Sequence, residues 1–492
     1  MNLEATLPVG EAVRVAREAQ PAWEGQPLQR RMEVLARFHQ RLFARRDDVV
    51  ACISRETGKP LAEALAVEVS TTLDQVRFVV RHAPHAFAPR RTVPEALALW
   101  RKRLVTEHRA WGVVGVIAPW NYPFMLPSGT VAALLAAGNA VVLKPSEFTP
   151  ATGELLGELL AESGLPAGLL HVLPSERAVG RALVEASVDK VFFTGSVETG
   201  TAVAQACAAR LIPCVLELGG CDPAIVLPDA DPTRTARGLT WGRFANAGQT
   251  CVASKRVIAV GEVYEPLVEA MCREVASLRL RSGGRSSWDM GDLIRPEAAE
   301  PLARLRDDAV ARGARAVSPA AGEGTAFAPT LLLDVPKDAR VLREEAFGPL
   351  LPVIRAATIE EGIALANANP FGLSASVWSS SRARARAVAG ELACGTVAIN
   401  DVAVVAGIAE VEHGGWKASG WGRSHGIEGL REAVRTRTIV DDVWPGRAQP
   451  WWFPYDEGLG RDLDGYVRLA HGGSPWARLS GLAATLRLLR RR

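Results

Sequence analysis

The sequence has few cysteines for its length, and their spacing argues against two kinds of cysteine chemistry. No pair of them stands in a CxxC arrangement, and their number is odd. Such a set is not typical of a disulfide framework, and without CxxC pairs a thiolate metal site has no support. We therefore expect a protein of a reducing compartment with no metal site. The seven positions are Cys52, Cys207, Cys214, Cys221, Cys251, Cys272 and Cys394.

Long apolar runs and a strong charge of one sign are also missing. No uninterrupted apolar run approaches the roughly 20 residues that are needed to span a bilayer. The first residues, Met1 to Ala5, lack a basic region followed by an apolar core. The chain carries 57 basic and 54 acidic residues, which gives a net charge of +3. This balance does not indicate binding to nucleic acid. We expect a cytoplasmic protein without a nucleic-acid partner.

What the sequence does contain is the composition of a folded chain with more than one domain. Hydrophobic residues make up 48% and charged residues 23%, which is ordinary for a globular protein. At roughly 150 residues per domain, a length of 492 predicts two or three domains. We see no internal repeat and no low-complexity linker.

Apolar periodicity indicates a helical opening followed by an α/β stretch. From about Val9 to Pro84 the apolar residues recur at helical spacing. After Pro94, short apolar runs such as 113–117 and 140–143 alternate with helix-like stretches. This alternation predicts a parallel sheet that is covered on both faces and binds its ligand at the carboxyl ends of the strands.

A second α/β stretch and a distinct tail follow. Strands are expected near 256–260 and 350–354, in a stretch that runs to about Val411. Beyond Trp444 the chain changes character, with the aromatic cluster 451–455 and a final stretch in which leucines recur at three- and four-residue spacing before the terminal arginines. This helix could pack on its own subunit or on a partner, or it could contact an anionic membrane surface. The leucines are Leu479, Leu482, Leu486 and Leu489.

Two residue types that support covalent catalysis stand 34 positions apart. Cys251 is a thiol in the segment Asn246 to Cys251, and Glu217 ends an apolar strand-like run. Sulfur is the best intrinsic nucleophile among side chains, and a carboxylate can serve as the base for a thiol or a water. Each residue alone is more often structural, Cys251 as a buried thiol and Glu217 as a cap or ion-pair partner.

Three further segments suit carbonyl and phosphate chemistry. Asn121, between two prolines, offers a side-chain amide to an oxyanion, although a turn residue is the commoner role. The glycines and Ser196 of 192–200 could place backbone amides against a phosphate, and a serine-capped turn would explain them as well. Lys144 and Glu147 could bind ribose hydroxyls, or they could form a solvated turn.

Seven motifs in order resemble the aldehyde dehydrogenase superfamily, and the resemblance covers about Val9 to Val440. Any one of them would be ambiguous, but their joint order is specific to this family. The motifs are Pro119 to Phe124, Gly138 to Glu147, Phe193 to Gly200, Glu217 to Gly220, Gly248 to Cys251, Glu345 to Pro349 and Gly414 to Gly426.

The resemblance implies a mechanism and a nicotinamide cofactor. Cys251 would attack the aldehyde, Asn121 and the Cys251 backbone amide would hold the oxyanion, and hydride transfer to nicotinamide would leave a thioester. Glu217 would then activate water to hydrolyse it. The resemblance also assigns cofactor positions: Lys144 and Glu147 on the adenosine ribose, Trp120, Gly195, Ser196 and Gly200 around the pyrophosphate, and Glu345 with Phe347 at the nicotinamide ribose. Glu147 favours NAD over NADP, because a carboxylate repels a 2′-phosphate.

The fold that the resemblance implies is α/β, with two doubly wound domains and a small β element for oligomerisation. We expect a cofactor-binding domain over 1–218, with oligomerisation strands near 95–110. A catalytic domain would span 219–415, and residues 416–446 would return to the cofactor domain and add an oligomerisation strand. Residues 447–492 would form a C-terminal appendage. The protein would be a homodimer or a homotetramer.

Two departures from the family pattern raise questions. Cys221 follows Glu-Leu-Gly-Gly where the family usually has lysine, and it could be an inert core residue or a competing thiol. Glu412 and His413 replace the usual Pro-Phe, which could reshape the substrate mouth or the subunit contact.

The sequence favours an apolar aldehyde as substrate: fatty, aromatic or terpenoid. The short N-terminus and the segments 211–213 and 400–402 look most like the branch that oxidises fatty, coniferyl and apocarotenoid aldehydes. Two alternatives stay open, a CoA-acylating semialdehyde dehydrogenase and a catalytically silent scaffold. Glu217 argues against the first, because that branch typically lacks this glutamate.

Overall fold

The structure is a computed structural model of the whole chain, and it describes residues 8–281, 287–318, 327–444, 449, 451–453 and 455–490. The chain divides into two units, one made of 1–86 and 110–434 and the other of 87–109 and 435–492. No helix among the described residues is long and apolar enough to cross a membrane.

The first unit opens with helices, as the apolar spacing predicts. The periodic residues Leu35, Phe38 and Leu42 form the buried face of α2, while Arg30 and Arg41 occupy exposed positions. The helices are α1 (Val9–Glu24), α2 (Leu28–Ala44), α3 (Arg46–Thr57), α4 (Leu61–Glu63), the π-helical turn η1 (Ala64–Ser70) and α5 (Thr71–Ala86).

A six-stranded sheet follows, and its strand order predicts where a ligand binds. The order is β17-β7-β6-β3-β4-β5, parallel except for β17. The chain runs outward from β3 to β5 and then returns to place β6 on the other side of β3. Right-handed connections therefore put α6 and α7 on one face and α8 and α9 on the other, and the carboxyl ends of β3 and β6 form a switch point where ligands bind. The elements are β3 (Val113–Ile117), α6 (Met125–Ala137), β4 (Ala140–Lys144), α7 (Pro150–Glu162), β5 (Leu170–Val172), α8 (Arg177–Glu185), β6 (Lys190–Thr194), α9 (Val197–Ala208), β7 (Cys214–Glu217) and β17 (Gly420–Trp421).

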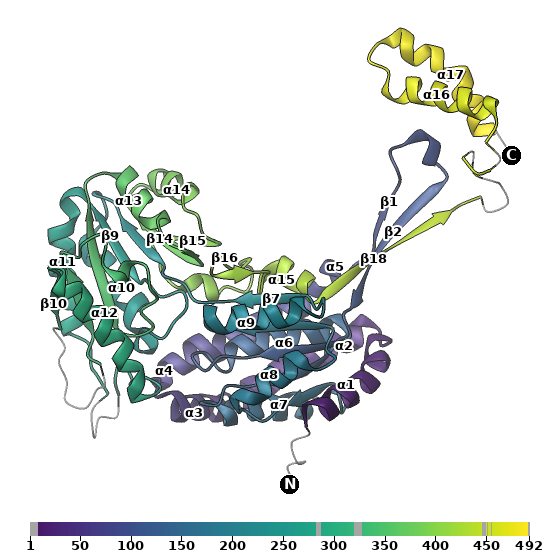
Figure 1. Cartoon of the computed structure of the whole chain (residues 1–492). Coiled ribbons are helices and arrows are strands. Elements are labelled where there is room, and N and C mark those ends of the chain that lie inside the picture. The colour runs from purple at the N-terminus through teal and green to yellow at the C-terminus, as the bar shows by residue number, and fades with distance from the viewer. Residues whose placement is uncertain are drawn as a thin grey trace. The chain divides into compact units, whose positions relative to one another are not determined.

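A seven-stranded sheet forms the second half of the first unit (Figure 1). Its order is β10-β11-β12-β9-β8-β14-β15, with only β10 antiparallel. The inner strands are almost wholly buried, whereas β10 is largely exposed and β15 is half-buried. The strands are β8 (Pro223–Val226), β9 (Arg256–Val260), β10 (Arg315–Val317), β11 (Thr330–Leu333), β12 (Leu350–Ala356), β14 (Ser374–Trp378) and β15 (Thr396–Ile399). The main helices are α10 (Pro232–Phe244), α11 (Tyr264–Ala276), α12 (Ala299–Ala311), α13 (Ile359–Asn367) and α14 (Arg382–Gly390), and β13 (Phe371–Gly372) pairs with β16 (Trp416–Lys417). Helix α15 (Gly426–Glu432) closes the unit.

The second unit contains a three-stranded sheet and a helical hairpin. The sheet has the order β1-β2-β18, with β1 (Arg90–Thr92), β2 (Lys102–Ala110) and β18 (Val434–Asp442). The hairpin consists of α16 (Glu457–His471) and α17 (Pro475–Arg490), which meet through small residues: a Cβ added at Gly465 would lie 2.2 Å from that of Ala484. The backbones of the two helices therefore approach closely.

Candidate active site

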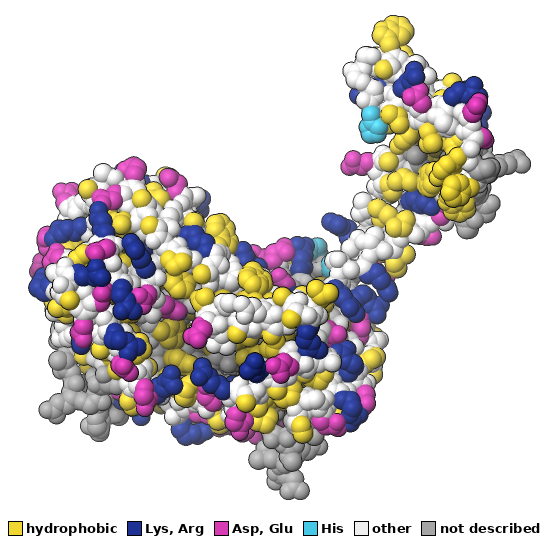
Figure 2. Space-filling model, in the orientation of Figure 1, with side chains coloured by type: hydrophobic (Ala, Val, Ile, Leu, Met, Phe, Trp, Pro, Cys, Tyr) yellow, Lys and Arg dark blue, Asp and Glu magenta, His cyan; other side chains and the backbone are white. Residues whose placement is uncertain are grey.

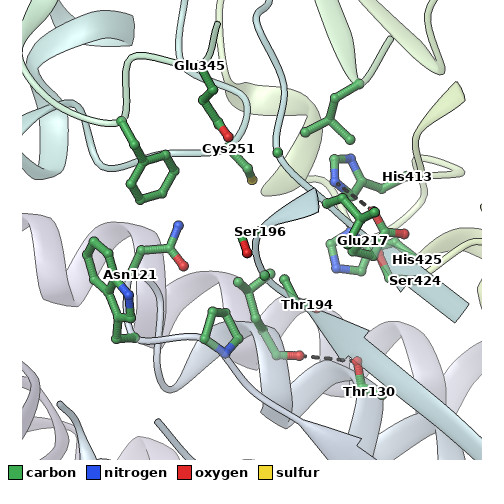
Figure 3. A pocket seen from close by; sticks show the side chains of 18 residues that line it. Asn121, Thr130, Thr194, Ser196, Glu217, Cys251, Glu345, His413, Ser424 and His425 are labelled. Carbon is green, nitrogen blue, oxygen red and sulfur yellow. Dashed lines mark hydrogen bonds and ion pairs between the residues drawn. The ribbon is translucent and has the colours of Figure 1, made fainter. Parts of the chain in front are cut away.

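A cavity of about 270 Å³ lies within the first unit, where the ends of β6 and β7 face segments of the seven-stranded sheet (Figure 3). Eight of the site residues that the sequence predicts line this cavity, and they come from five separate stretches of the chain. Those lining the cavity are Asn121, Trp120, Gly195, Ser196, Glu217, Cys251, Glu345 and Phe347.

A strained turn carries Cys251 into this cavity. The chain leaves α10 through a short 3-10 turn, Ala245–Gly248, in which Asn246 and Ala247 have φ of 51° and 53°. Such left-handed backbone is costly for residues with a side chain and is typical of functional sites. Gly248, at φ 74°, allows a close approach, because an added Cβ would lie 2.5 Å from the carbonyl of Gly348. The turn is thereby fixed against the segment that contains Glu345.

Lys255 connects Cys251 to Glu345. Its Nζ donates to the Cys251 backbone oxygen at 2.7 Å and to Glu345 Oε1 at 2.6 Å. Burial raises the pKa of the Cys251 thiol to about 12, and Lys255 opposes that effect. The resting nucleophile is therefore a protonated thiol with one cation close by.

Hydrogen bonds fix Asn121 on the opposite wall of the cavity. Its Nδ2 donates to the Gln249 backbone oxygen at 3.1 Å. Its own backbone oxygen accepts from Asn246 Nδ2 at 3.0 Å and from Lys59 Nζ. Asn121 is thus bonded to two residues of the segment that carries the thiol, and its amide points into the cavity in Figure 3. Preorganised amides of this kind can stabilise an oxyanion.

Glu217 ends β7, and its carboxyl group is buried. Within the described chain, neither carboxyl oxygen has a partner of ordinary hydrogen-bond geometry. Burial raises the pKa of Glu217 to about 8, while the Ser424 hydroxyl and Arg423 act in the opposite direction. At neutral pH this group is mostly the carboxylic acid, so it must lose a proton before it can act as a base.

Two histidines beside Glu217 were not nominated as site residues from the sequence. His413 and His425 line the same cavity, and His413 Nε2 lies 3.9 Å from Glu217 Oε2. Burial lowers the pKa of His413 to about 4 and that of His425 to about 3, so both rings are neutral. In the sequence, only the replacement of the family's usual Pro-Phe by Glu412 and His413 draws attention to this position. That replacement does not indicate that the His413 ring faces Glu217.

A second, open cavity of about 910 Å³ adjoins the first at the switch point of the six-stranded sheet. Trp120, Gly195 and Ser196 line both cavities. Lys144 and Glu147 lie at the end of β4, with Lys144 Nζ 3.5 Å from Glu147 Oε2. Ser196 caps α9 by accepting from the Thr199 backbone amide, which leaves the positive end of that helix toward the cavity.

These residues fit a dinucleotide. A helix N-terminus suits the pyrophosphate, the side chains of Lys144 and Glu147 suit a ribose, and an apolar wall from α8 and α9 suits an adenine face. That wall consists of Val184, Ala202 and Val203. Gly200 lines neither cavity, because its role is packing: an added Cβ would lie 2.4 Å from Leu218 Cδ2. Trp120 meets Phe347 edge-on, with ring centroids 5.5 Å apart.

Cys221 is buried away from the reacting groups. Its thiol faces the backbone oxygens of Leu342 and Glu344 at 4.0 and 3.8 Å, and it does not line the cavity of Cys251. Burial raises its pKa. This placement fits an inert core residue. Glu412 accepts from the backbone amides of Ile427 and Glu428, so its carboxylate caps the start of α15.

Several residues that build the site were absent from the sequence prediction. Arg243 is fully buried and donates to the backbone oxygens of Ala346 and Gly348, which holds the segment of Glu345 and Phe347 in place. Lys59 forms a buried ion pair with Glu68, and Glu68 accepts from the amides that begin α6. Sequence gives no signal for such roles, because the partners are backbone groups that come together only on folding.

Comparisons with known proteins agree with the geometry. A family model described as the aldehyde dehydrogenase family matches residues 5–439. The chain is 35% identical over 457 residues to a 4,4'-diapolycopene aldehyde oxidase of a Methylomonas species, covering 93% of this chain and 86% of the relative. It is 35% identical over 441 residues to the glutarate-semialdehyde dehydrogenase of Pseudomonas putida, covering 89% and 90%.

A solved structure shares the fold. The crystal structure of a Mycobacterium tuberculosis aldehyde dehydrogenase complexed with NAD+ matches with a TM-score of 0.84 at 30% identity, covering 89% of this chain and 91% of that one. The α/β fold class that the sequence predicts is thereby confirmed.

Proposed function

Because the chain belongs to the aldehyde dehydrogenase family and is therefore an oxidoreductase that acts on aldehydes, we propose that it oxidises an apolar aldehyde to the acid with NAD as acceptor. The observation that carries the proposal is the convergence of Cys251, Asn121 and Glu217 on one cavity beside a dinucleotide-sized groove. A nucleophile, an oxyanion donor and a base are the groups that a covalent oxidation with hydrolysis requires.

In the first half of the reaction, Cys251 attacks the aldehyde carbonyl. Its thiol loses a proton to solvent, and the nearby Lys255 ammonium favours the thiolate. The S–C bond forms while the carbonyl oxygen becomes an oxyanion, which accepts from Asn121 Nδ2 and the Cys251 amide. When this adduct collapses, a hydride would leave the former aldehyde carbon for the nicotinamide of a cofactor held in the groove, and an acyl group remains on sulfur as a thioester.

The groove residues would hold the cofactor during this step. Lys144 and Glu147 would bind the adenosine ribose, Ser196 and the start of α9 the pyrophosphate, and Glu345 the nicotinamide ribose. Bound NAD+ supplies the hydride acceptor. Lys255 orients Glu345 by its 2.6 Å contact, so that one lysine supports both the nucleophile and the cofactor site.

In the second half, Glu217 accepts a proton from water. The water oxygen bonds to the acyl carbon, the C–S bond breaks, and the acid leaves as Cys251 regains its proton. A carboxyl group at the end of β7 is well placed for this because it lines the same cavity as the thiol. The same residue disfavours the CoA-acylating alternative, in which a thiol would replace water, and its presence with Cys251 and Asn121 disfavours the silent scaffold.

The cavity lining supports an apolar substrate. Among the described residues that line it, none is lysine or arginine, while Leu126, Leu218, Leu373 and Phe347 contribute apolar walls. The far carboxylate of a semialdehyde would be buried there without a counter-charge, which is costly. The relative named for 4,4'-diapolycopene aldehyde oxidation points in the same direction. A fatty, aromatic or terpenoid aldehyde meets no such penalty.

The preference for NAD over NADP rests on Glu147. Its carboxylate at the ribose position would repel a 2′-phosphate. Arg177 Nε lies 4.0 Å from Glu147 Oε1 and is exposed, so it weakens this repulsion without removing the carboxylate. We expect NAD to be used more efficiently than NADP.

Strand β18 supports a homo-oligomer. It is an edge strand of its three-stranded sheet, and most of its residues are exposed. An exposed edge with unpaired backbone groups is a surface for pairing with another chain. We propose that β18 contributes to a homodimer or homotetramer. Light scattering on the eluate of a sizing column would measure the mass, and a monomeric mass at micromolar concentration would exclude this assignment.

The hairpin α16–α17 supports contact with an anionic membrane surface. Helix α17 turns its small residues to α16 and leaves apolar side chains exposed, and Figure 2 shows hydrophobic side chains at the surface of this hairpin. Trp476 of α17 is 81% exposed, and Phe453, which precedes the hairpin, is 83% exposed. The exposed leucines of α17 are Leu479, Leu482 and Leu486. Arg478, Arg487 and Arg490 are its only charged residues, so the helix is cationic. Apolar and aromatic groups flanked by arginines suit the interface of an anionic bilayer.

Co-sedimentation with phosphatidylglycerol vesicles tests the membrane contact. The full chain should sediment with the vesicles, while a chain ending at Asp456 should stay in solution. A full chain carrying Trp476→Ser, Leu479→Ser and Leu482→Ser keeps the small-residue contact of the hairpin and should also lose binding. Equal partitioning of all three proteins would exclude the membrane contact.

A decisive experiment on the main proposal measures NADH formation with decanal, a water-dispersible fatty aldehyde. Cys251→Ala should form no NADH. Glu217→Gln should give one burst of NADH and then turn over at least ~100-fold more slowly than the parent, because general-base catalysis is lost. Unimpaired turnover of the Cys251 variant would disprove the covalent route.

A further inference from the structure

We propose that His413 and His425 form a buried positioning pair that takes up the proton of Glu217 inside the protein and thereby turns this carboxyl group into a base. The inference rests on the proposed function, because it concerns the water-activating step assigned to Glu217. Both histidines come from the segment 412–425, which follows the seven-stranded sheet and returns to β7.

The distances define a short polar chain that begins at the base. His413 Nε2 lies 3.9 Å from Glu217 Oε2, the contact drawn as a dashed line in Figure 3. The rings of His413 and His425 have centroids 5.5 Å apart and are tilted by 31°. His425 Nε2 then lies 3.0 Å from Gln75 Nε2 of α5. A carboxyl, two imidazoles and an amide therefore follow one another through the interior.

Polar atoms without partners are concentrated along this chain. In native proteins about 90% of buried polar groups have a hydrogen bond, so a cluster of exceptions calls for a functional explanation. Here the exceptions are contiguous, and each is a group that can donate or accept a proton or hold a water. Within the described residues they are both carboxyl oxygens of Glu217, Nδ1 of His413, Nδ1 of His425, Oγ of Ser424 and Oε1 of Gln75.

A small cavity adjoins the far end of the chain. It has a volume of about 20 Å³ and is lined by Gln75, Ser424 and His425 among apolar neighbours. A space of this size with three polar partners fits one water molecule. Such a water would hydrogen-bond the unpartnered atoms of Gln75, Ser424 and His425. It would also stabilise a positive charge on the imidazole pair.

Proton transfer within this cluster balances without any outside group. The O–H bond of Glu217 breaks as an N–H bond forms at His413 Nε2, which converts a neutral pair into a carboxylate and an imidazolium. The net charge of the pair stays zero, and the attraction between the two opposite charges across 3.9 Å offsets part of the cost of burying each of them. The base is then ready although the cavity is filled by an apolar acyl group.

The same proton returns at the end of hydrolysis. Water gives a proton to the Glu217 carboxylate as its oxygen bonds to the acyl carbon. When the C–S bond breaks, Glu217 passes that proton to the Cys251 thiolate, and His413 returns its proton to Glu217. Water and thioester have become acid and thiol, and every protein group is restored.

Among the residues that the structure describes, the charged and titratable groups that act on this cluster lie in its own segment, in α15 and across the cavity. Arg423 disfavours a second positive charge nearby and lies in the same segment as the histidines, whereas Glu432, at the end of α15, disfavours the Glu217 carboxylate. Cys251 faces Glu217 across the cavity. The Glu412 carboxylate is bound by the amides at the start of α15.

The test compares His413→Phe and His425→Leu with the parent and with His39→Phe as a matched control. Phenylalanine preserves the ring volume, and His39 lies in α2 outside the cavity. Each protein is mixed with NAD+ and decanal, the NADH burst is recorded, and the acyl-enzyme is quantified by intact-protein mass spectrometry after acid quenching.

In His413→Phe the burst should be retained, which shows that the protein folds and that Cys251 reacts. Hydrolysis of the acyl-enzyme should slow by roughly 10- to 100-fold, as expected for the loss of a proton-transfer partner. Its pH dependence should also change. Between pH 6 and 8 the parent should be nearly flat, because the transfer is internal. His413→Phe should gain about tenfold per pH unit, because Glu217 must then lose its proton to solvent.

His413→Ala with added imidazole provides a second readout, since a diffusible base should restore hydrolysis in that variant and have no effect on the parent. A His413→Phe enzyme with the parent's hydrolysis rate and pH profile would overturn the inference. Failure of the proposed function looks different: the parent itself would show no burst or no acyl adduct on Cys251.

Discussion

At the scale of single residues, the thiols of this protein differ in reactivity in a way that only the fold explains. Burial raises the pKa of Cys251 to about 12, whereas the pKa of Cys214 lies below its ordinary value because the Cys207 thiol, Trp421 and Lys190 stabilise its charge. Only the thiolate reacts with alkylating agents. Identity as cysteine is therefore a poor guide to which sulfur reacts first.

We expect iodoacetamide at pH 7 to label Cys214 before Cys251 in the absence of ligands. Labelling of Cys251 should accelerate by about tenfold per pH unit over pH 7 to 10, because the thiolate fraction rises by that factor below the pKa. Lys255→Met should slow it further. Peptide mapping by mass spectrometry measures each site, and preferential labelling of Cys251 at pH 7 would contradict the burial argument.

Cofactor choice is also decided at this scale. Glu147→Gln removes the carboxylate beside Lys144 and leaves Arg177 as the nearest charge on that side. We expect the ratio of kcat/KM for NAD over NADP to fall by roughly tenfold, corresponding to one lost like-charge repulsion of about 1.4 kcal/mol. Arg177→Gln is the matched control and should raise the ratio. An unchanged ratio in Glu147→Gln together with a raised ratio in Arg177→Gln would show that Arg177, rather than Glu147, dominates the site.

The sequence indicated the reacting residues and missed those that support them. Cys251, Glu217 and Asn121 stand in motifs, and the structure brings them to one cavity; their roles remain predictions. Lys255 and Arg243 stand in no motif that chemistry would single out, because each acts through hydrogen bonds to backbone oxygens distant in sequence. His413 was noticed as a departure from the family pattern. Its distance to Glu217 depends on the path of a whole segment.

At the scale of elements, the sequence predicts the buried strands better than it predicts the turns. The run 256–260 is β9 as expected, and 350–354 lies within β12, because continuous apolar runs bounded by polar residues are characteristic of buried parallel strands. The turn before Cys251 was not foreseen. Asn246 and Ala247 adopt left-handed backbone that their side chains disfavour, and only contacts with other segments hold them there.

Two glycine variants distinguish the cost of left-handed backbone from the cost of close contact with the Glu345 segment. Gly248→Ala places a Cβ on left-handed backbone and 2.5 Å from the carbonyl of Gly348. Gly313→Ala also has a positive φ, of 108°, but meets nothing within 4 Å. The second should cost about 1–2 kcal/mol of backbone strain. The first should cost a further ~1–3 kcal/mol from overlap and should also impair NADH formation.

Thermal denaturation and NADH assays on both glycine variants provide the measurement. Equal destabilisation of the two, with activity intact in Gly248→Ala, would show that the approach of the thiol segment to the Glu345 segment is loose. The expected result is a selective loss of activity in Gly248→Ala.

At the scale of the whole molecule, the buried histidines make stability depend on pH. In the folded protein the pKa of His425 is about 3, against an ordinary value of 6.5. Between these values the unfolded chain binds a proton that the folded chain does not, so acidification favours unfolding. The stability that depends on a neutral His425 is complete above pH 6.5 and is lost as the pH falls toward 3.

Replacing His425 by Leu should therefore flatten the acid limb of the stability profile. The parent should lose about 1.4 kcal/mol more than the variant for each pH unit below 6.5. Denaturation midpoints measured from pH 7 to pH 4 on both proteins test this. His85→Gln, which changes an exposed position of α5 and leaves the buried pair intact, should track the parent. Parallel curves for parent and His425→Leu would mean that the ring protonates freely in the folded state.

The pairing of β17 with β7 in the six-stranded sheet determines when the active site forms during synthesis of the chain. Strand β7, which carries Glu217, is completed on its outer side by β17, and Gly420 lies opposite Glu217 in that ladder. Ser419 accepts from the Leu218 amide and donates its hydroxyl to the Gly219 oxygen, so the base is held by residues translated some 200 positions later. While the ribosome is still short of that point, the nascent chain already contains the nucleophile but lacks the wall around the base. The nascent chain is therefore inactive until β17 has been synthesised. An mRNA truncated before codon 420 would yield a chain that has the thiol but cannot hydrolyse the thioester.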